Sequence, residues 1–551
     1  MNWFRNRSLR RTLALWLLPL AFVLAFFFYP LLKILGLAGE GGTGMITWMA
    51  IWRPLRFSLL QAGLSTLLTL LIGLPAAWIF GRFAFPGKRL LAALTTLPFI
   101  LPVVTAAAGF NALLGPNGWL NLLAMRLLGL ENPPISLLNT LGAILLGHVF
   151  YNTAIVIRLV GSAWAGLDVR LEHAARVLGA SPWQALKEVT LPLLRPAVLS
   201  AALLVFLFDF TSFGVVLLLG GPRFATLEVE IYIQALQMLN LPLAGVLSLV
   251  QLGFTLLFIV LSNRLGSGVS VPLAPRLSGE GVRRPRTPAE WVFVWGGVLT
   301  LAGLLLAPLA ALMARSVVSL ESGDLTLAYY RELFINRRQG LFYVPPAQAA
   351  LNSLLVAGLA TGLALLLGML AAYAARGKAG FSRWAETALM LPLGASAVTL
   401  GLGFIITYGK VAGAPGFPVL LPVAHALAGL PFVLRAVQPA LASIPPSLGR
   451  AAAVLGASPW RVWREVDLPI LGRALLVGGV FAFTISLGEF GATTFLTKPD
   501  FPTLPIAIFR FLGQPGALNY GQAMAMATLL LLVCAAALLL VDNKMPEKKN
   551  P

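Results

Sequence analysis

The sequence predicts an all-α polytopic membrane protein with about twelve transmembrane helices in two parallel six-helix repeats. Three observations support this fold class. Of the 551 residues, 58% are hydrophobic and only 11% are charged, whereas a soluble domain is about 45–50% apolar and about 25% charged. The apolar residues form runs long enough to cross a bilayer, and a segment of the first half recurs in the second. This composition excludes soluble domains, and it excludes a disordered chain, which requires low hydrophobicity.

The predicted spans form two sets of six. A membrane-spanning helix needs about 20 largely apolar residues. Such runs occupy 13–37, 56–80, 91–114, 139–161, 195–220 and 241–262, and then 291–315, 350–375, 386–408, 418–440, 473–497 and 518–541. The segment 264–290 between the sets is rich in arginine, proline and glycine, which is typical of an exposed linker. We therefore expect a first transmembrane domain at 1–263, a basic linker at 264–290 and a second domain at 291–551.

The charges are strongly unbalanced, with 40 Lys and Arg against 20 Asp and Glu. A basic nucleic-acid-binding surface or the cytoplasmic loops of a membrane protein would produce this balance. If the N-terminus lies inside, the cytoplasmic segments hold 28 of the 40 cations, with at least three in each. These segments are 1–12, 81–90, 158–195, 264–290, 376–385, 435–473 and 542–551. We therefore expect a multi-pass protein of the cell (inner) membrane, with both termini cytoplasmic and no nucleic-acid partner.

A seven-residue segment between the fourth and fifth spans is duplicated. Val177–Trp183 reads VLGASPW and recurs unchanged as Val454–Trp460, at an offset of 277 residues. The same offset matches His148 with His425, and upstream the offset becomes 294–295. Since each six-span unit would begin and end inside, the repeats are parallel, which is typical of transporters with a pathway between the two halves.

The duplicated segment contains a helix end and a helix start. Gly179 and Gly456 can end a helix through a left-handed backbone. The next residues can start another helix, with a serine cap and a proline at the first position. These residues are Ser181, Pro182, Ser458 and Pro459. Two short helices outside the membrane would form a projection suited to docking on a two-fold partner. The alternative is an amphipathic helix that lies on lipid headgroups.

These segments, at about 170–192 and 447–469, resemble the "EAA…G…LP" loop of ABC-importer permeases. The matching residues are Ala174, Ala175, Gly179, Leu191 and Pro192, and Ala451, Ala452, Gly456, Leu468 and Pro469. The glutamate of the family pattern is replaced by His173 and by Arg450, although Glu172 stands one residue earlier in the first half. The resemblance implies a cytoplasmic coupling helix in each half that binds a dimer of ATP-binding cassette subunits. It also implies an extracytoplasmic solute-binding protein as a second partner.

The chain has no nucleotide-binding loop of its own. Gly409-Lys410 is followed by valine rather than by serine or threonine, which does not fit the phosphate-binding pattern. We therefore expect no bound cofactor and no enzyme activity, with ATP and Mg²⁺ on the partner subunit. With one cysteine and three histidines, no metal site is expected either.

Two acids lie inside the fifth spans, at Asp209 and Glu489. An ionisable residue within a membrane is costly and faces a polar cavity or a partner. One hypothesis places these acids on a pathway for a cationic solute, together with Ser212, Phe213, Ser486 and Phe490. The alternative is a structural pairing of each acid with His148, Arg158, His425 or Arg435. After these spans, Glu228, Glu230 and Asp500 are expected to be exposed acids that face a binding protein.

The segment 208–215, FDFTSFGV, resembles thiamine permeases, and 486–491, SLGEFG, resembles ferric-iron permeases. The resemblance therefore implies a fused two-domain permease of a binding-protein-dependent ABC importer that carries a small, cationic solute. An ion-coupled secondary transporter with buried acids remains the alternative, as does an ABC permease for polyamine, sulfate or phosphonate.

Overall fold

The computed structural model describes residues 14–40, 47–95, 97–221, 223–265, 282–335, 344–376, 380–413 and 418–542. The described part of the chain is helical, and its extended segments form only isolated bridges between single residues. The predicted cytoplasmic termini and residues 266–281 of the predicted linker lie outside the described residues.

Ten described helices are long and apolar enough to cross a membrane. They are Ala14–Gly39, Trp48–Arg82, Leu141–Ala165, Pro182–Phe210, Leu241–Ser262, Pro288–Val317, Pro346–Ala375, Leu420–Ala442, Pro459–Gly488 and Ala517–Leu540. The two remaining predicted spans are not single helices. The span predicted at 91–114 is divided into three helices, and the span predicted at 386–408 bends by 101° between Gly394 and Ala397.

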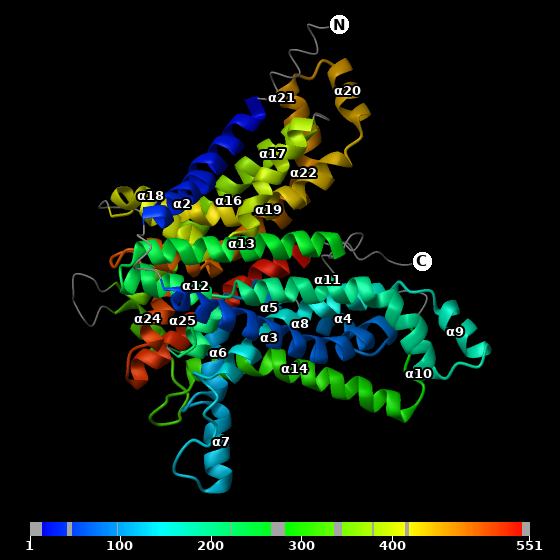
Figure 1. Cartoon of the computed structure of the whole chain (residues 1–551), viewed down its shortest axis with the longest axis vertical. Coiled ribbons are helices and arrows are strands. Elements are labelled where there is room, and N and C mark those ends of the chain that lie inside the picture. The colour runs from blue at the N-terminus through cyan, green and yellow to red at the C-terminus, as the bar shows by residue number, and fades with distance from the viewer. Residues whose placement is uncertain are drawn as a thin grey trace. The chain divides into compact units, whose positions relative to one another are not determined.

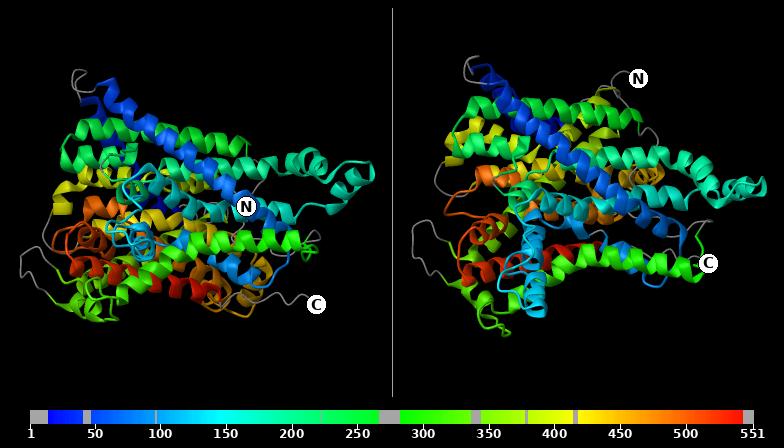
Figure 2. Two further views of the ribbon diagram at one scale, coloured as in Figure 1. Left: turned by 90° about the horizontal axis from the view of Figure 1, so that it is seen from below. Right: turned by 60° about the horizontal axis from the view of Figure 1, so that its bottom comes forward.

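The chain forms two compact units, each assembled from separate parts of the sequence. Unit 2 comprises Gly42–Ile233 and Leu247–Thr326. Its helices are α3 (Trp48–Arg82), α4 (Lys88–Leu94), α5 (Leu97–Ile100), α6 (Val103–Leu114), α7 (Trp119–Leu128), α8 (Leu141–Ala165), α9 (Val169–Val177), α10 (Pro182–Ala185), η2 (Leu186–Thr190), α11 (Leu191–Phe210), η3 (Val216–Gly220), α12 (Leu227–Tyr232), most of α13 (Leu241–Leu265) and α14 (Pro288–Val317). In Figure 1, α9 and α10 project beyond the ends of α8 and α11, and Figure 2 shows the same projection in two further views.

Unit 1 comprises Met1–Gly41, Gln234–Val246 and Leu327–Pro551. Its described helices begin with η1 (Leu24–Phe28), α2 (Tyr29–Glu40) and η4 (Ile233–Gln237, from Gln234 onward). They continue with α15 (Ala328–Arg331), η5 (Glu332–Phe334), α16 (Pro346–Ala375), α17 (Gly380–Met390), η6 (Leu391–Gly394), α18 (Ala397–Gly413), α19 (Leu420–Ala442), α20 (Pro446–Val454), α21 (Pro459–Val462), η7 (Trp463–Asp467), α22 (Leu468–Gly488), α23 (Gly491–Leu496), α24 (Leu504–Leu512) and α25 (Ala517–Asp542).

Each unit contains the first span of the other sequence half. In unit 2, α14 packs along α6, and Trp119 Nε1 donates to the Ala311 carbonyl at 3.2 Å. In unit 1, α2 packs on α18, and the Tyr408 hydroxyl donates to the Ala25 carbonyl at 2.8 Å. The packing units therefore differ from the consecutive sequence halves by an exchange of first spans.

The core of each unit is a close packing of its second span against its fourth. In unit 2, a Cβ added at Gly73 would lie 2.7 Å from Val156 Cβ. In unit 1, a Cβ added at Gly368 would lie 2.6 Å from Val433 Cγ1. Both pairs are equivalent in the repeat. Small residues allow helix backbones to approach closely where lipid provides no hydrophobic driving force, so the two halves keep the same contact.

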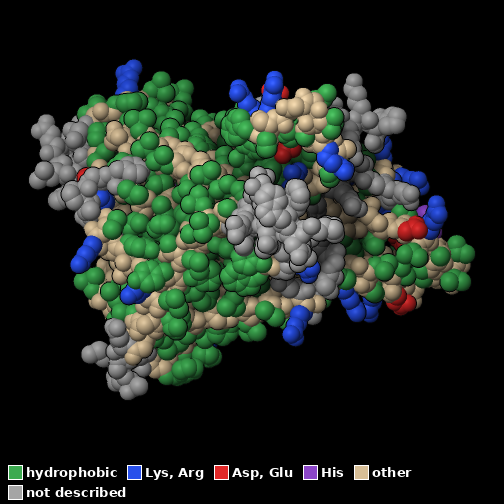
Figure 3. All heavy atoms as spheres, turned by 90° about the horizontal axis from the view of Figure 1, so that it is seen from above, with side chains coloured by type: hydrophobic (Ala, Val, Ile, Leu, Met, Phe, Trp, Pro, Cys, Tyr) green, Lys and Arg blue, Asp and Glu red, His purple; other side chains and the backbone are tan. Residues whose placement is uncertain are grey.

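The exposed surface of the long helices is largely apolar. Leu17, Leu67, Leu71 and Leu299 are among the large side chains that remain exposed. On the face shown in Figure 3, hydrophobic side chains cover much of the described surface, and Lys and Arg side chains lie mainly toward the margins. This distribution suits a protein surrounded by hydrocarbon, because no polar face is then needed along the spans.

Candidate functional site

The duplicated segment forms a helix–turn–helix in the first half. α9 ends at Val177, and Gly179 follows with φ +96°. The Ala180 amide donates to the Ala175 carbonyl at 3.0 Å, and the Gly179 amide donates to Arg176 at 3.1 Å. These two bonds are the Schellman pattern, which closes a helix over a left-handed residue. The prediction that Gly179 ends a helix is confirmed.

The second half repeats this turn with the same bonds. Gly456 has φ +85°, the Ala457 amide donates to Ala452 at 3.0 Å, and Gly456 donates to Ala453. No atom lies within 4 Å of a Cβ built on either glycine. The backbone angle, and not a lack of space, therefore explains why glycine occupies both turns.

Serine caps the second helix of each turn, as the sequence predicts. Ser181 Oγ accepts from the Gln184 amide, and the Gln184 side chain accepts from the Ser181 amide, so α10 begins with a full capping box. Ser458 Oγ accepts from the Arg461 amide at 3.3 Å. The proline at the first position of each helix has no amide hydrogen to satisfy.

The tip of each turn carries large apolar side chains in the open. Val177 and Leu178 are 87% and 88% exposed, and Val454 and Leu455 are both 87% exposed. The tryptophan at the end of each motif, Trp183 or Trp460, is also exposed. The predicted loop residues His173, Ala174, Arg450 and Ala451 are exposed, whereas Glu172, Ala175 and Ala452 are half-buried. A repeated apolar tip is a surface suited to a protein partner.

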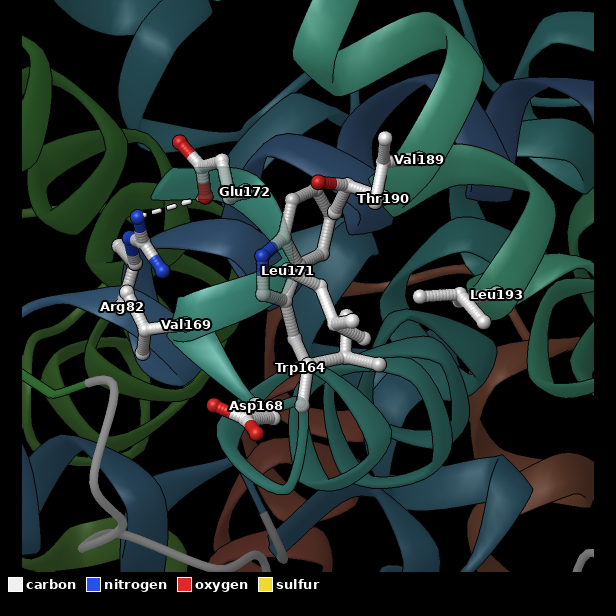
Figure 4. A pocket seen from close by; sticks show the side chains of 10 residues that line it. Arg82, Trp164, Asp168, Val169, Leu171, Glu172, Val189, Thr190 and Leu193 are labelled. Atoms are coloured by element: carbon white, nitrogen blue, oxygen red, sulfur yellow. Dashed lines mark hydrogen bonds and ion pairs between the residues drawn. The ribbon is translucent and has the colours of Figure 1, made fainter. Parts of the chain in front are cut away.

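An ion pair holds the base of the first turn. Arg82, at the end of α3, donates from Nη2 to Glu172 Oε2 at 2.7 Å, beside a small pocket that Trp164 and Leu171 help to line (Figure 4). The Arg283 backbone bonds the end of α3 and the loop that follows it, because its amide donates to the Arg82 carbonyl and its carbonyl accepts from the Ala84 amide, both at 2.9 Å. Its hydrogen bond with the Glu290 carboxylate, and then the nearby charges of Glu290 and Glu172, raise the pKa of Arg283.

The second turn is held by the equivalent arginine and a different acid. Arg376 lies 294 residues after Arg82, but residue 449, which is equivalent to Glu172, is glycine. Arg376 instead lies 3.8 Å from Asp467 in η7 and donates to the Leu441 carbonyl. The Tyr373 hydroxyl donates to the same Asp467 carboxylate at 2.9 Å.

A single helical run connects each turn to the fifth span. It extends from Pro182 to Phe210 in unit 2 and from Pro459 to Gly488 in unit 1, with one π-helical turn in each, η2 and η7. The wide turn lies directly before Leu191-Pro192 and Leu468-Pro469. Proline cannot donate to the fourth preceding carbonyl and crowds it, so the helix widens there instead of breaking.

The predicted fifth spans end earlier than expected because each helix is interrupted. α11 stops at Phe210 and α22 at Gly488, and a short second helical segment follows each break. Both predicted fifth spans are present, but the predicted bounds 195–220 and 473–497 are wrong where they extend one helix past Phe210 and Gly488.

Asp209 lies in the last turn of α11 and is completely buried. Its Oδ1 accepts from Asn152 Nδ2 at 2.6 Å and lies 3.6 Å from His148 Nδ1. Ser65 Oγ bonds the same histidine nitrogen at 2.9 Å, and Gln61 donates to the Asp209 carbonyl at 2.7 Å. Four helical side chains thus surround the end of α11.

Glu489 forms the corresponding cluster in the second half. Its carboxylate accepts from the amides of Ala492 and Thr493 at the start of α23, both at 2.8 Å. His425 Nε2 lies 3.2 Å from Glu489 Oε2 and 2.8 Å from Thr493 Oγ1, while Nδ1 bonds Ser486 Oγ at 2.7 Å. Each acid therefore contacts a histidine of the fourth span, as the structural alternative expected. Phe213 and Phe490 are buried, and Ser212 is half-buried.

The expectation of three exposed acids near the outer ends of the spans is only partly correct. Asp500 is exposed and Glu230 is half-buried. Glu228 is 1% exposed and accepts a hydrogen bond from Gln251 Nε2, so its prediction as a surface acid is wrong.

Sequence reasoning missed the polar partners within the helices. Arg82 and Arg376 share the repeat offset and could have been found as a pair. Ser65, Asn152 and Thr493 have no polar repeat equivalent, so nothing in the sequence singles them out.

Comparison with known proteins identifies related permeases. Residues 364–544 match the family described as "Binding-protein-dependent transport system inner membrane component". The chain is 30% identical over 519 residues to the thiamine transport system permease protein ThiP of Escherichia coli, with 91% of each chain covered. It is 27% identical to ThiP of Brucella abortus, covering 94% of this chain and 93% of the relative.

A solved bacterial ABC transporter involved in the import of alginate is 18% identical, covers 48% of this chain and 97% of its own, and has a TM-score of 0.40. The likeness to E. coli ThiP extends over nearly the whole length of both proteins, through both copies of the turn. The chain therefore belongs to the family of fused two-domain permeases of binding-protein-dependent importers that includes ThiP.

Proposed function

We propose that this permease imports thiamine, driven by ATP hydrolysis on a separate dimer of ATP-binding cassette subunits. The observation that carries the coupling part of the proposal is the pair of exposed apolar tips, Val177-Leu178 and Val454-Leu455. Two equal tips, each followed by a continuous helix into the membrane, suit a partner that presents the same surface twice. ATP and Mg²⁺ bind to that partner. Both termini of this chain lie in the cytoplasm, on the same side of the membrane as the partner.

A lipid-bound helix explains the tips less well. A helix on headgroups buries its apolar side chains in the bilayer boundary, and it would then gain nothing from a strictly repeated turn. Here both turns keep one sequence and one bond pattern, although the rest of the halves has diverged. The shared geometry supports the proposal that both turns bind a protein partner.

The docking role is tested by placing a charge in each tip. Leu178→Asp and Leu455→Asp are introduced alone and together. Glu131→Ser, which changes an exposed loop residue, is the control. We expect the ATPase subunit to co-purify weakly with either single variant and not at all with the double variant. An ATPase that stays bound to the double variant contradicts the proposal.

The proposal of thiamine as the substrate is supported by the relatives, which are thiamine transport system permease proteins. A binding protein on the outer side would deliver the solute, and this chain would supply the route. The test is uptake of labelled thiamine by cells that lack their own thiamine permease and carry this chain with its partner subunits. Thiamine uptake supports the proposal, whereas uptake of ferric iron without thiamine overturns the substrate.

A further inference from the structure

The fifth span is interrupted at equivalent places in the two halves. We define the first joint as residues 211–213 and the second joint as residues 489–490, between the helices on either side. At the offset of 277 residues, the helices resume at Gly214 in the first half and at Gly491 in the second. The joint is therefore a feature of the repeat and not an accident of one sequence.

An aromatic pair fixes the far side of each joint. The Phe213 ring lies 5.5 Å from that of Tyr232 at the end of α12. The equivalent Phe490 ring lies 5.4 Å from that of Phe509 in α24. Such pairs stabilise a contact beyond the apolar area they bury, and both halves retain this one.

A buried serine of the second span fixes the helix that carries this aromatic partner. Ser58 Oγ accepts from the Leu227 amide at 2.8 Å, at the start of α12. Ser353 Oγ accepts from the Leu504 amide at 2.7 Å, at the start of α24. Each bond satisfies an amide that the helix itself leaves without a partner.

A histidine of the fourth span lies beside the near side of each joint, but the acid has changed position. His425 Nε2 lies 3.2 Å from Glu489 Oε2, whereas His148 Nδ1 lies 3.6 Å from Asp209 Oδ1, which accepts its hydrogen bond from Asn152. Asp209 is equivalent to Ser486, and Glu489 is equivalent to Ser212. In the second half, Nε2 of His425 faces Glu489. In the first half, Nε2 of His148 has no hydrogen-bond partner among the described residues, and it is the nitrogen that an acid at position 212 would face.

We propose that His148 and His425 are positioning residues of the transport cycle, each holding its joint through one carboxylate that either of two equivalent positions can supply. The helical run from the coupling turn ends at this joint, so a displacement of the turn reaches the point that the histidine holds. The inference rests on the proposed function for the origin of that displacement. The pairing itself rests on contacts within each unit.

The test moves the acid between its two positions. Asp209→Ser removes it from the first half, and Asp209→Ser with Ser212→Glu reproduces the arrangement of the second half. We expect the single variant to lower the maximal rate of thiamine uptake about tenfold. The buried Asn152 loses its hydrogen-bond acceptor, and His148 loses the neighbouring carboxylate. The maximal rate of the double variant should recover to within about threefold of that of the unaltered chain, because positions 209 and 212 are coupled.

The second half offers the reciprocal pair of variants. Glu489→Ser is the single variant, and Glu489→Ser combined with Ser486→Asp is the double variant. Glu131→Ser serves as the control for loss of an acid outside both joints. A positioning role predicts that the maximal rate falls, while the concentration of binding protein at half-maximal rate stays constant and the chain is present in normal amounts. A purely structural role would instead change the rate only in proportion to the amount of chain.

Two results overturn the inference. One is a single variant with full uptake, and the other is a double variant no better than its single parent when both are present in normal amounts. The unfolding temperature of the purified chain should show the same loss and recovery. If the unaltered chain carries no thiamine, the proposed function fails, while the unfolding temperatures still decide the pairing.

Discussion

Gly179 and Gly456 show how a single backbone angle can determine a functional surface. Each residue holds a left-handed conformation that presents the next helix and the apolar tip. A side chain in this conformation costs about 1–2 kcal/mol. We expect Gly179→Ala and Gly456→Ala each to weaken ATPase binding and uptake, and the double variant to lose most of both, as measured by co-purification and transport.

Gly472 provides a matched control for these two variants. It lies in α22, and a Cβ built on it meets nothing within 4 Å. Since alanine favours a helix by about 1 kcal/mol over glycine, Gly472→Ala should leave binding unchanged. Equal losses at all three glycines would show that left-handed geometry is not the cause.

Arg82, at the base of the first coupling turn, acts through its ion pair with Glu172. Arg82 and Glu172 are partly exposed, so their ion pair contributes at most about 1 kcal/mol to folding. Its expected effect is on coupling. Arg82→Ala and Glu172→Ala should each lower ATP-driven uptake, and the double variant should be no worse than either, because both remove one contact. Losses that add in the double variant would show that the residues act separately.

At this scale, the sequence allowed the caps and the histidine neighbours of the two acids to be predicted, but not the other polar partners of the acids. Glycine, serine and proline act on their own backbone, so their spacing is sufficient. Asp209 and Asn152 are far apart in sequence and meet only because α8 packs beside α11. Glu489 likewise caps α23, a helix that a continuous apolar run does not predict.

Among the elements, the second and fourth spans form the most demanding contact. The space opposite Gly73 and Gly368 is filled by a valine. Gly73→Val and Gly368→Val should therefore separate these helices and lower the unfolding temperature of the purified chain. Gly63→Val, in α3 but with nothing within 4 Å of its Cβ, should have little effect. A similar fall in all three would contradict the packing argument.

Hydropathy predicts where helices cross the membrane but not where they break. The predicted span 91–114 contains Pro98 and Pro102, and the break before α6 lies at Pro102. The bend before α18 follows Pro392. Proline lacks an amide donor, yet it leaves the mean hydropathy of a window almost unchanged. The breaks in the fifth spans contain no proline, and their polar contacts only become visible in three dimensions.

For the molecule as a whole, we predict that both coupling turns lie in the cytoplasm. Ser181→Cys and Ser458→Cys should react with a membrane-impermeant thiol reagent in inside-out vesicles but not in intact cells. Asp500→Cys should show the opposite pattern. The natural Cys534 is 1% exposed, so background labelling should be low. Labelling of either turn from outside would contradict the orientation.

The exchange of first spans between the packing units could not be predicted from the sequence. The repeat aligns consecutive halves, whereas helix packing depends on which surfaces meet in the folded chain. The composition, the repeat and the turn motif nevertheless predicted the correct family. Composition is counted directly from the sequence, and the repeat and the motif are local sequence patterns that do not depend on how the helices pack.

We expect this chain to move its solute only when a separate ATPase acts on it. The most direct measurement is thiamine uptake into liposomes that contain the chain. The binding protein is added on one side of the membrane, and ATP is supplied on the opposite side, where the coupling turns lie. We predict uptake only when the ATPase subunits are also present and ATP is hydrolysed. Uptake by the chain alone, driven by an ion gradient, would contradict the claim.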